Sequence, residues 1–252
     1  MLRFRDDLTG SLAELTVAPS VPLRVLVDGA SCGADFGLRA VRVLLVADVL
    51  VRIAELSGLQ VVTVLAASGW PPEALEQTVA ALDLHPLPVA GSAGDAAAVL
   101  GGRAHLRVAA SGAGPGDGVL IGVGPADDLT PGGRSAQPGA SGDPLALRLA
   151  LLGYPYRQPV TLTEAALAEA QDTVGRWRHA VAKWATEPSR PIPAETAHRI
   201  SVAFDTDLDT PAALDVLVNL EPDGEAPAGA KFETFAFADR VLGLELVREI
   251  GR

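Results

Sequence analysis

The chain has 252 residues, of which 48% are hydrophobic and 20% are charged. It can therefore bury a core of ordinary size, and it is neither a disordered nor a fibrous protein. A single cysteine and four scattered histidines exclude a disulfide framework and a multi-cysteine metal site. The formal net charge of -11 disfavours a nucleic-acid surface, because phosphate binding needs clustered cations. The opening residues do not resemble a signal peptide and no apolar run is long enough to cross a bilayer, so we expect a cytoplasmic protein without membrane contact.

The first half of the chain alternates between apolar strands and helices. The pattern predicts strands over residues 22–29 and 59–66, with a long apolar helix over 37–56 between them. It also predicts a helix beginning near Pro71, a short helix over 95–100, and strands over 105–110 and 119–123. Strands joined by helices indicate a Rossmann-like parallel sheet that binds ligands at the carboxyl ends of its strands.

The second half is predicted to be helical. Residues 130–142 are rich in Gly, Pro and Ser and form a flexible connection. Helices are predicted over 144–152, over 164–184 with Thr163 as N-cap, over 195–220 with a restart at residues 209–211, and over 232–250. We therefore expect an α/β fold with two domains, a Rossmann-like core over residues 1–142 and an all-helical domain over residues 143–252.

Five segments, in chain order, carry a resemblance to a known family. They are RFRDDLTG (3–10), VDGASCGADFGLRAVRVLLVADVL (27–50), LRLALLGYPYRQPVTLTEAALAEA (147–170), FDTDLDTPAALDVL (204–217) and DRVLGLEL (239–246). Together they resemble the cysteinyl-tRNA synthetases, class I enzymes with a Rossmann-type core followed by a helical domain. The resemblance is patchy through residues 70–140 and depends on the order of the segments.

The motifs that this family uses for activating an amino acid are missing. Its His-Ile-Gly-His loop, which stabilises the ATP phosphates, corresponds to residues 37–40, which read Gly-Leu-Arg-Ala. Its Lys-Met-Ser-Lys-Ser loop has no counterpart, because no lysine precedes Lys183, and only Arg134 supplies a cation there. The family's zinc ligands fall on Asp28, near Val108 and in DLTPGGRSA, which do not form a zinc site. The resemblance thus implies a truncated paralogue that also lacks the core insertion and the anticodon-binding domain.

Several candidate ligand-binding residues lie around the first strand-to-helix turn. The run 29–33 either lets backbone N–H groups approach a phosphate or forms a tight turn. Asp28 could bind an ammonium group or cap that turn, and Cys32 is either a reactive thiol or a small buried residue. We assign no catalytic residue and no metal ligand. The candidates are Asp28, Gly29, Ser31, Cys32, Gly37, Arg39, Trp70 and Arg134.

Two further patterns have a structural interpretation. Trp177 and Trp184, seven residues apart, are predicted to pack in a helix core and not to stack on bases. Asp205, Asp207 and Asp209 alternate as calcium ligands do, but lack the EF-hand spacing and fall at an expected helix start.

The main functional hypothesis is a catalytically inactive relative of the cysteinyl-tRNA synthetases that acts as a nucleotide- or small-molecule-binding or protein-interaction module with a regulatory role. An alternative is an ATP-dependent amino-acid ligase in which Arg39, Arg42 or Arg134 replaces the missing donors. A second alternative is a tRNA-binding accessory protein, which the acidic balance disfavours. The candidate cofactor is ATP, zinc is not expected, and the candidate partners are another protein, a second copy of the chain, or an amino acid or nucleotide.

Overall fold

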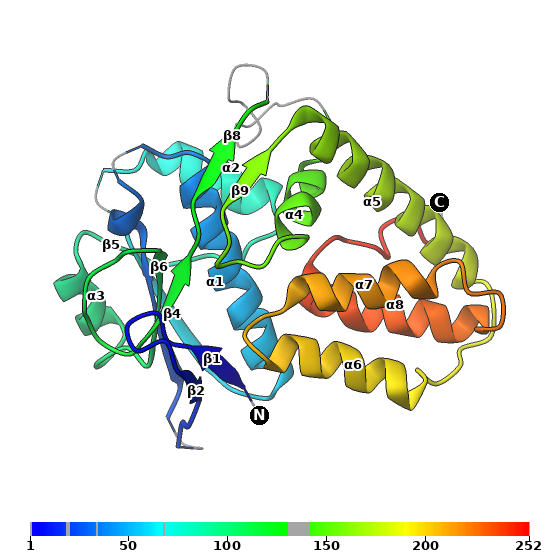
Figure 1. Ribbon diagram of the computed structural model, residues 1–252, viewed down its shortest axis with the longest axis horizontal. Coiled ribbons are helices and arrows are strands. Elements are labelled where there is room, and N and C mark those ends of the chain that lie inside the picture. Colours follow the sequence, from blue (N-terminus) through cyan, green and yellow to red (C-terminus); the bar gives the residue numbers. More distant parts are fainter. Residues whose placement is uncertain (1, 19–20, 34, 68, 131–141, 252) are drawn as a thin grey trace.

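The computed structural model describes residues 2–18, 21–33, 35–67, 69–130 and 142–251. Its centre is a five-stranded parallel sheet with the strand order β5-β4-β3-β6-β7 (Figure 1). The strand order reverses between β3 and β6, which places the topological switch point of a Rossmann-like sheet there. The predicted α/β class is therefore confirmed. The strands are β3 (Leu23–Asp28), β4 (Val61–Ala66), β5 (Val89–Ala90), β6 (Leu106–Ala110) and β7 (Val119–Val123).

Helices cover both faces of this sheet. The long helix α1 (Leu38–Leu56) packs on the face formed by residues such as Val25 and Val108, and it is buried along most of its length. The short helix α3 (Ala93–Val99) covers the opposite face, where Leu26 and Val64 are buried. Because both faces are covered, the strands are mostly apolar and do not alternate regularly with polar residues. Within the described residues, no helix combines the length and apolar character that crossing a membrane requires.

The second half of the chain is helical and lies on one side of the sheet (Figure 1). Capping side chains fix several helix starts where the sequence predicted them. Thr163 accepts a hydrogen bond from the backbone N of Ala166 at 3.2 Å, and Asp209 accepts one from Ala212 at 3.1 Å. Asp209 is thus an N-cap, as expected. The helices are α4 (Pro144–Leu152), α5 (Glu164–Trp184), α6 (Ala194–Asp205), α7 (Thr210–Leu220) and α8 (Ala228–Leu242).

The expected helix over residues 232–250 is wrong at its carboxyl end. Helix α8 stops at Leu242, because Gly243 adopts a left-handed conformation with φ 60°. The carboxylate of Asp239 then accepts hydrogen bonds from the backbone N of Leu244 at 2.7 Å and of Leu246 at 2.8 Å. Glycine is the usual residue at this position, and the side-chain bonds satisfy N–H groups that no longer belong to a helix.

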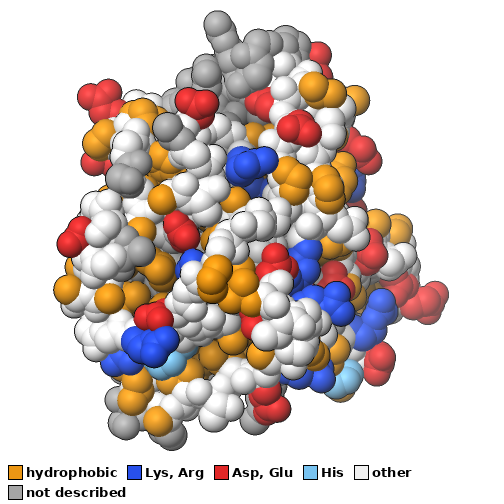
Figure 2. Space-filling model, turned by 60° about the vertical axis from the view of Figure 1, so that its left-hand side comes forward, with side chains coloured by type: hydrophobic (Ala, Val, Ile, Leu, Met, Phe, Trp, Pro, Cys, Tyr) orange, Lys and Arg blue, Asp and Glu red, His pale blue; other side chains and the backbone are white. Residues whose placement is uncertain are grey.

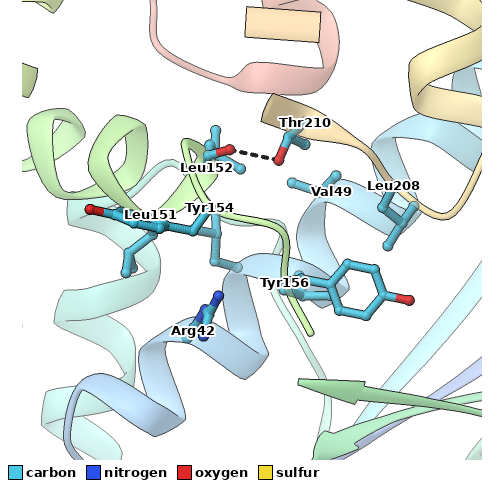
Figure 3. A pocket seen from close by; sticks show the side chains of 10 residues that line it. Arg42, Val49, Leu151, Leu152, Tyr154, Tyr156, Leu208 and Thr210 are labelled. Atoms are coloured by element: carbon cyan, nitrogen blue, oxygen red, sulfur yellow. Dashed lines mark hydrogen bonds between the residues drawn. The ribbon is translucent and has the colours of Figure 1, made fainter. Parts of the chain in front are cut away.

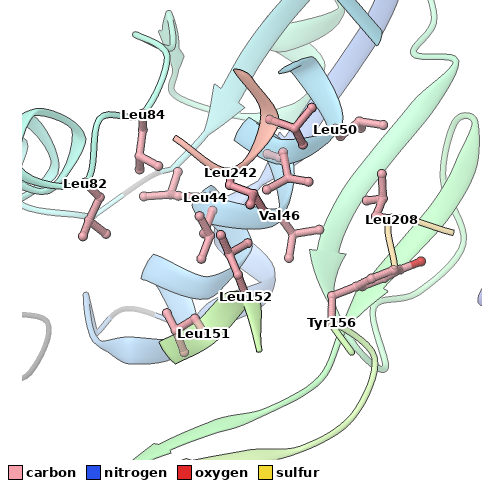
Figure 4. Packing of buried hydrophobic residues seen from close by; sticks show 14 of the residues in the cluster. Leu44, Val46, Leu50, Leu82, Leu84, Leu151, Leu152, Tyr156, Leu208 and Leu242 are labelled. Atoms are coloured by element: carbon pink, nitrogen blue, oxygen red, sulfur yellow. The ribbon is translucent and has the colours of Figure 1, made fainter. Parts of the chain in front are cut away.

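One hydrophobic core runs through both halves of the chain. Leu44 and Leu50 of α1 belong to the same cluster of buried residues as Leu151, Leu152 and Leu242 of the helical part (Figure 4). A small parallel sheet also joins the halves, because β8 (Ala126–Asp128) pairs with β9 (Val160–Leu162). Burial of this shared apolar surface is the main force that holds the two halves together.

The tryptophans of α5 belong to the same core, as predicted. Trp177 is 1% exposed and meets Phe235 of α8 edge-on, with ring centroids 5.5 Å apart. Trp184 makes a similar contact with the same ring at 5.1 Å. Such edge-to-face pairs stabilise helix packing beyond the area that they bury.

The outer edge of β7 is covered by the N-terminal hairpin of β1 (Arg3–Arg5) and β2 (Leu12–Glu14). The carboxylate of Asp6 accepts a hydrogen bond from the backbone N of Leu120 at 3.1 Å, and the backbone N of Asp7 donates to the carbonyl of Leu120 at 2.9 Å. These bonds use backbone groups that an exposed edge would offer to another chain.

Candidate functional site

The carboxyl ends of β3 and β6 are bridged by Ser31. This residue lies in η1 (Gly29–Cys32), a single turn of 3₁₀ helix that follows β3. Its Oγ donates to the carbonyl of Asp28 at 2.5 Å and accepts from the backbone N of Ala110 at 2.8 Å. The N–H at the end of β6, which a ligand at the switch point could use, is therefore already bonded to the protein. Of the two interpretations of the run 29–33, this geometry favours the tight turn.

Asp28 is the cap of that turn. Its carboxylate accepts a hydrogen bond from the backbone N of Ser31 at 3.3 Å. Its other oxygen lies 3.7 Å from the guanidinium of Arg107 on β6. Because a cation already lies beside the carboxylate, the capping interpretation is favoured over the binding of an ammonium group.

Arg107 is a site residue that sequence reasoning missed. Its guanidinium lies under the loop after β6 and donates to the carbonyl of Gly114. Its Nε is buried and has no hydrogen-bond partner among the described residues. The sequence does contain a signal for this residue, since Arg107 is a charged residue inside the short apolar run HLRVAA. A strand covered on both faces rarely holds an arginine without a specific partner.

Trp70 packs directly over the turn. A Cβ atom added at Gly29 would lie 2.8 Å from the indole ring, so the absence of a side chain there permits the contact. The indole Nε1 donates to the carbonyl of Gly33 at 3.3 Å, and Phe36 meets the ring edge-on with centroids 5.1 Å apart. The structure therefore brings together five of the eight candidates, namely Asp28, Gly29, Ser31, Cys32 and Trp70.

The remaining candidates lie at the start of α1 or outside the described residues. Gly37 is the N-cap residue of α1, in an extended conformation and without a side-chain cap. Arg39 lies exposed in the first turn of that helix. Arg134 falls within residues 131–141, outside the described residues.

The suggestion that Arg42 could replace a phosphate-binding donor is wrong. Its side chain is 1% exposed and donates to the carbonyls of Gly124, Pro125, Pro155 and Gln158 at 2.7–3.0 Å. Burial lowers its pKa to about 10. It joins α1 to the segments around β8 and β9.

The small pocket beside Arg42 does not provide a ligand site either. Figure 3 shows Arg42 at one end and, at the other, Thr210, whose hydroxyl donates to the carbonyl of Leu152 at 2.8 Å. The pocket has a volume of about 20 Å³, which is little more than the space of one water molecule.

The positions that would hold zinc do not fit the metal. Val108 is a fully buried aliphatic residue, and Asp28 is used in the turn. Across the described ranges, no group of three or more His, Cys, Asp or Glu side chains is placed to hold a metal ion. Zinc needs about four N, S or O ligands, so we derive no step through this metal.

Cys32 is a partly buried thiol. Burial raises its pKa to about 11, and this outweighs the hydrogen bond with Ser31 and the charge of Arg39, both of which lower it. The thiol is therefore neutral at physiological pH, and the buried-residue interpretation is favoured over the reactive one.

We expect Cys32 in the native protein to react with iodoacetamide at least about tenfold more slowly than an ordinary free thiol at pH 7.5. A rise from 9.0 to about 11 reduces the thiolate fraction about 100-fold, and the greater nucleophilicity of a more basic thiolate recovers part of this loss. Mass spectrometry of timed samples measures the rate. The protein unfolded in urea is the control, and equal rates in both states would contradict the buried assignment.

Asp48 organises the charges between α1 and the helical part. Its carboxylate lies 2.6 Å from Arg148 of α4, 2.8 Å from Arg52 and 2.7 Å from the imidazole Nδ1 of His85. Burial acts to raise the pKa of Asp48, but the hydrogen bond from His85 and the two guanidinium charges hold it well below its usual value. Asp48, which lies in the second of the five segments that carry the resemblance, thus has a structural role.

His85 should make the protein less stable as the pH rises above 6.5. The hydrogen bond to Asp48 raises its pKa above the usual 6.5, against burial and the charge of Arg52, and Glu55 lies 3.5 Å from its Nε2. Protonated His85 therefore stabilises the fold below pH 6.5, and this contribution is lost as the pH rises through the raised pKa. We therefore expect the free energy of unfolding of His85→Gln, measured by urea unfolding at a series of pH values, not to fall in this way above pH 6.5.

His105 provides a control, because its contribution to stability should change with pH in the direction opposite to that of His85. Its Nδ1 accepts a hydrogen bond from the backbone N of Arg24 at 3.0 Å, and burial lowers its pKa. Neutral His105 is favoured in the fold, so its contribution grows as the pH rises toward 6.5. If His85→Gln and His105→Gln changed the pH dependence in the same direction, the assignment of at least one of the two rings would be wrong.

The fold and the switch point define a Rossmann-like α/β protein with a helical region packed on its core. A comparison with models of known protein families gives no match. Among curated proteins, the chain is similar to ligases named L-cysteine:1D-myo-inositol 2-amino-2-deoxy-alpha-D-glucopyranoside ligase. The identity is 36% over 108 residues for Segniliparus rotundus, 34% over 108 for Kribbella flavida and 37% over 109 for Nocardiopsis dassonvillei.

These matches cover 41–42% of this chain and 25–26% of each relative. The chain thus spans about a quarter of the length of the curated relatives that it matches. The expected resemblance was to cysteinyl-tRNA synthetases, and the partial relatives are named as ligases of L-cysteine. The comparison therefore supports a likeness to cysteine ligases.

Proposed function

We propose that this chain is a cysteine ligase-like protein that does not activate an amino acid and acts as a small-molecule-binding or protein-interaction module with a regulatory role. The observation that carries the proposal is the Ser31 bridge. Its hydroxyl bonds to the ends of both β3 and β6, where a Rossmann-like sheet normally receives its ligand.

The charged groups near the switch point support the same proposal. Activation of a carboxylate by ATP needs cationic or hydrogen-bonding donors aimed at the phosphates. Arg42 is bonded to four carbonyls, and Arg107 lies beside Asp28 under a loop. Of the cations in the first turns of α1, Arg39 is the exposed one, and a single exposed arginine is a poor substitute for a set of preorganised donors.

We also propose that residues 1–142 form a degenerate catalytic core and residues 143–252 a helical domain. The ion pair of Asp48 with Arg148 joins these parts at 2.6 Å, which favours a fixed arrangement between them. Accessory binding of tRNA is less well supported, since the net charge is -11 and basic side chains are interspersed with acidic ones on the face in Figure 2.

The proposal is tested by ATP–pyrophosphate exchange with the full chain, Mg²⁺ and each amino acid, with cysteine first. We expect no exchange above that of heat-inactivated protein, and no rise in melting temperature with ATP and Mg²⁺. A ligand that binds only the native state must raise the melting temperature, so a rise with an amino acid without exchange would support a binding module.

Cysteine-dependent exchange would overturn the proposal in favour of the ligase with a rebuilt site, and Arg39→Gln would then show whether that residue contributes. Ser31→Gly serves as a second variant, because it frees the backbone N of Ala110. We expect this variant to remain inactive in exchange, since the donors for the phosphates are still missing. Salt-dependent binding of tRNA would favour the accessory protein instead.

A further inference from the structure

An apolar pocket lies between α2 (Pro72–Ala81) and the edge strand β5, and Trp70 forms part of its lining. Its volume is about 280 Å³, near the lower end of the range for small-molecule sites. One side is the helix face formed by Leu75 and Val79, and the other comes from the proline-rich segment before β5. The full lining is Ala67, Trp70, Pro72, Leu75, Glu76, Val79, Pro86, Leu87 and Val89.

Glu76 is the charged residue in this lining. It is exposed, and among the described residues it takes part in no ion pair. A carboxylate at the rim of an apolar hollow attracts a cation and repels an anion, with a modest energy because the group is solvated. We infer that this pocket binds a small primary amine whose apolar tail fills the hollow and whose ammonium group pairs with Glu76.

The shape of the region favours a small molecule over a macromolecule. The neighbouring edge strand β5 has only two residues, Val89 and Ala90, so it offers few backbone groups to an added strand. The hollow is lined by side chains from a helix, a loop and a strand, which suits a ligand of fragment size. This inference does not depend on the proposed function, because Ser31 and Ala110 do not line the pocket and only Trp70 is common to both places.

Trp70 gives the pocket a built-in reporter. Its indole lines the hollow and also contacts Gly29 and Phe36, and its Nε1 donates to the carbonyl of Gly33. An occupant that touches the ring should therefore shift the indole N–H resonance. That resonance is identified by its disappearance in Trp70→Phe.

The test is a titration of the full chain, labelled with ¹⁵N in its tryptophans, with three probes of equal length: hexylamine, 1-hexanol and hexanoate. We expect a saturable shift of the Trp70 signal by hexylamine, about threefold tighter than by hexanol, since an exposed charge pair adds less than about 1 kcal/mol. Hexanoate should bind most weakly. No saturable shift with any probe, or hexanoate binding as tightly as hexylamine, would overturn the inference.

Three variants separate the contribution of the charge from that of the apolar hollow. Glu76→Gln should remove the preference for amine over alcohol and leave hexanol binding unchanged. Glu73→Gln, on the same helix but outside the lining, should retain the preference. Val79→Phe fills the hollow and should abolish the response to all three probes. If the preference persisted in Glu76→Gln, the charge assignment would be wrong. ATP–pyrophosphate exchange uses none of these groups, so the two proposals fail independently.

Discussion

Arg148→Met is expected to lower the free energy of unfolding by about 3–5 kcal/mol, because it breaks a buried ion pair and leaves the other charge in place. The Arg148 side chain is fully buried. It donates to Asp48 at 2.6 Å and to the carbonyls of Leu82 at 2.8 Å and Leu242 at 2.5 Å. Methionine fills most of the volume but satisfies none of these acceptors. Urea unfolding followed by circular dichroism measures the loss.

Arg103→Met is the matched control for this variant. Arg103 also pairs with a carboxylate, that of Asp117 at 2.7 Å, but its side chain is 84% exposed. Exposed pairs contribute less than about 1 kcal/mol, so this variant should unfold almost as the parent does. The double variant Asp48→Asn/Arg148→Met should recover part of the loss, because the buried carboxylate charge is removed together with its buried partner, while Arg52 keeps its pair with Asp83. Equal losses in Arg148→Met and Arg103→Met would mean that the pair does not hold the two halves together.

Much of the fold could be predicted because local signals agree with the tertiary structure. The helix over residues 37–56 is apolar enough to be placed against a sheet, and the observed α1 spans Leu38–Leu56. Thr163 and Asp209 precede their helices as N-caps usually do. The carboxyl end of α8 was missed, because the apolar residues after Gly243 continue a helical spacing that the left-handed glycine interrupts.

The site was predicted only in part, because the hydrogen bonds that occupy the switch point join segments that are distant in the sequence. The sequence placed Asp28 and Ser31 after the first strand and Trp70 after the second, and residues that follow parallel strands share one edge of the sheet. The bond from Ala110 to Ser31 joins residues 79 positions apart. Arg42 is a similar case, because only the tertiary structure shows that four carbonyls surround its guanidinium.

The short connection between β6 and β7 explains why a glycine is required at position 118. The two strands are parallel neighbours, yet residues 111–118 alone join them, whereas parallel strands usually need a connection of about a dozen residues or more. Gly118 ends the connection with φ 78°, and a Cβ there would lie 2.5 Å from the carbonyl oxygen of His105. We expect Gly118→Ala to lower the free energy of unfolding by about 2–4 kcal/mol, from the left-handed backbone and the backbone clash together.

Gly112→Ala separates those two causes, because Gly112 lies in the same connection with φ 84° and a Cβ there would meet nothing within 4 Å. This variant bears only the conformational cost, about 1 kcal/mol. The difference between the two variants in urea unfolding therefore measures the clash with the backbone of His105, a contact that cannot move aside as a flexible side chain would. If both alanine variants lost the same stability, the direct crossing from β6 to β7 would not depend on the close approach at Gly118.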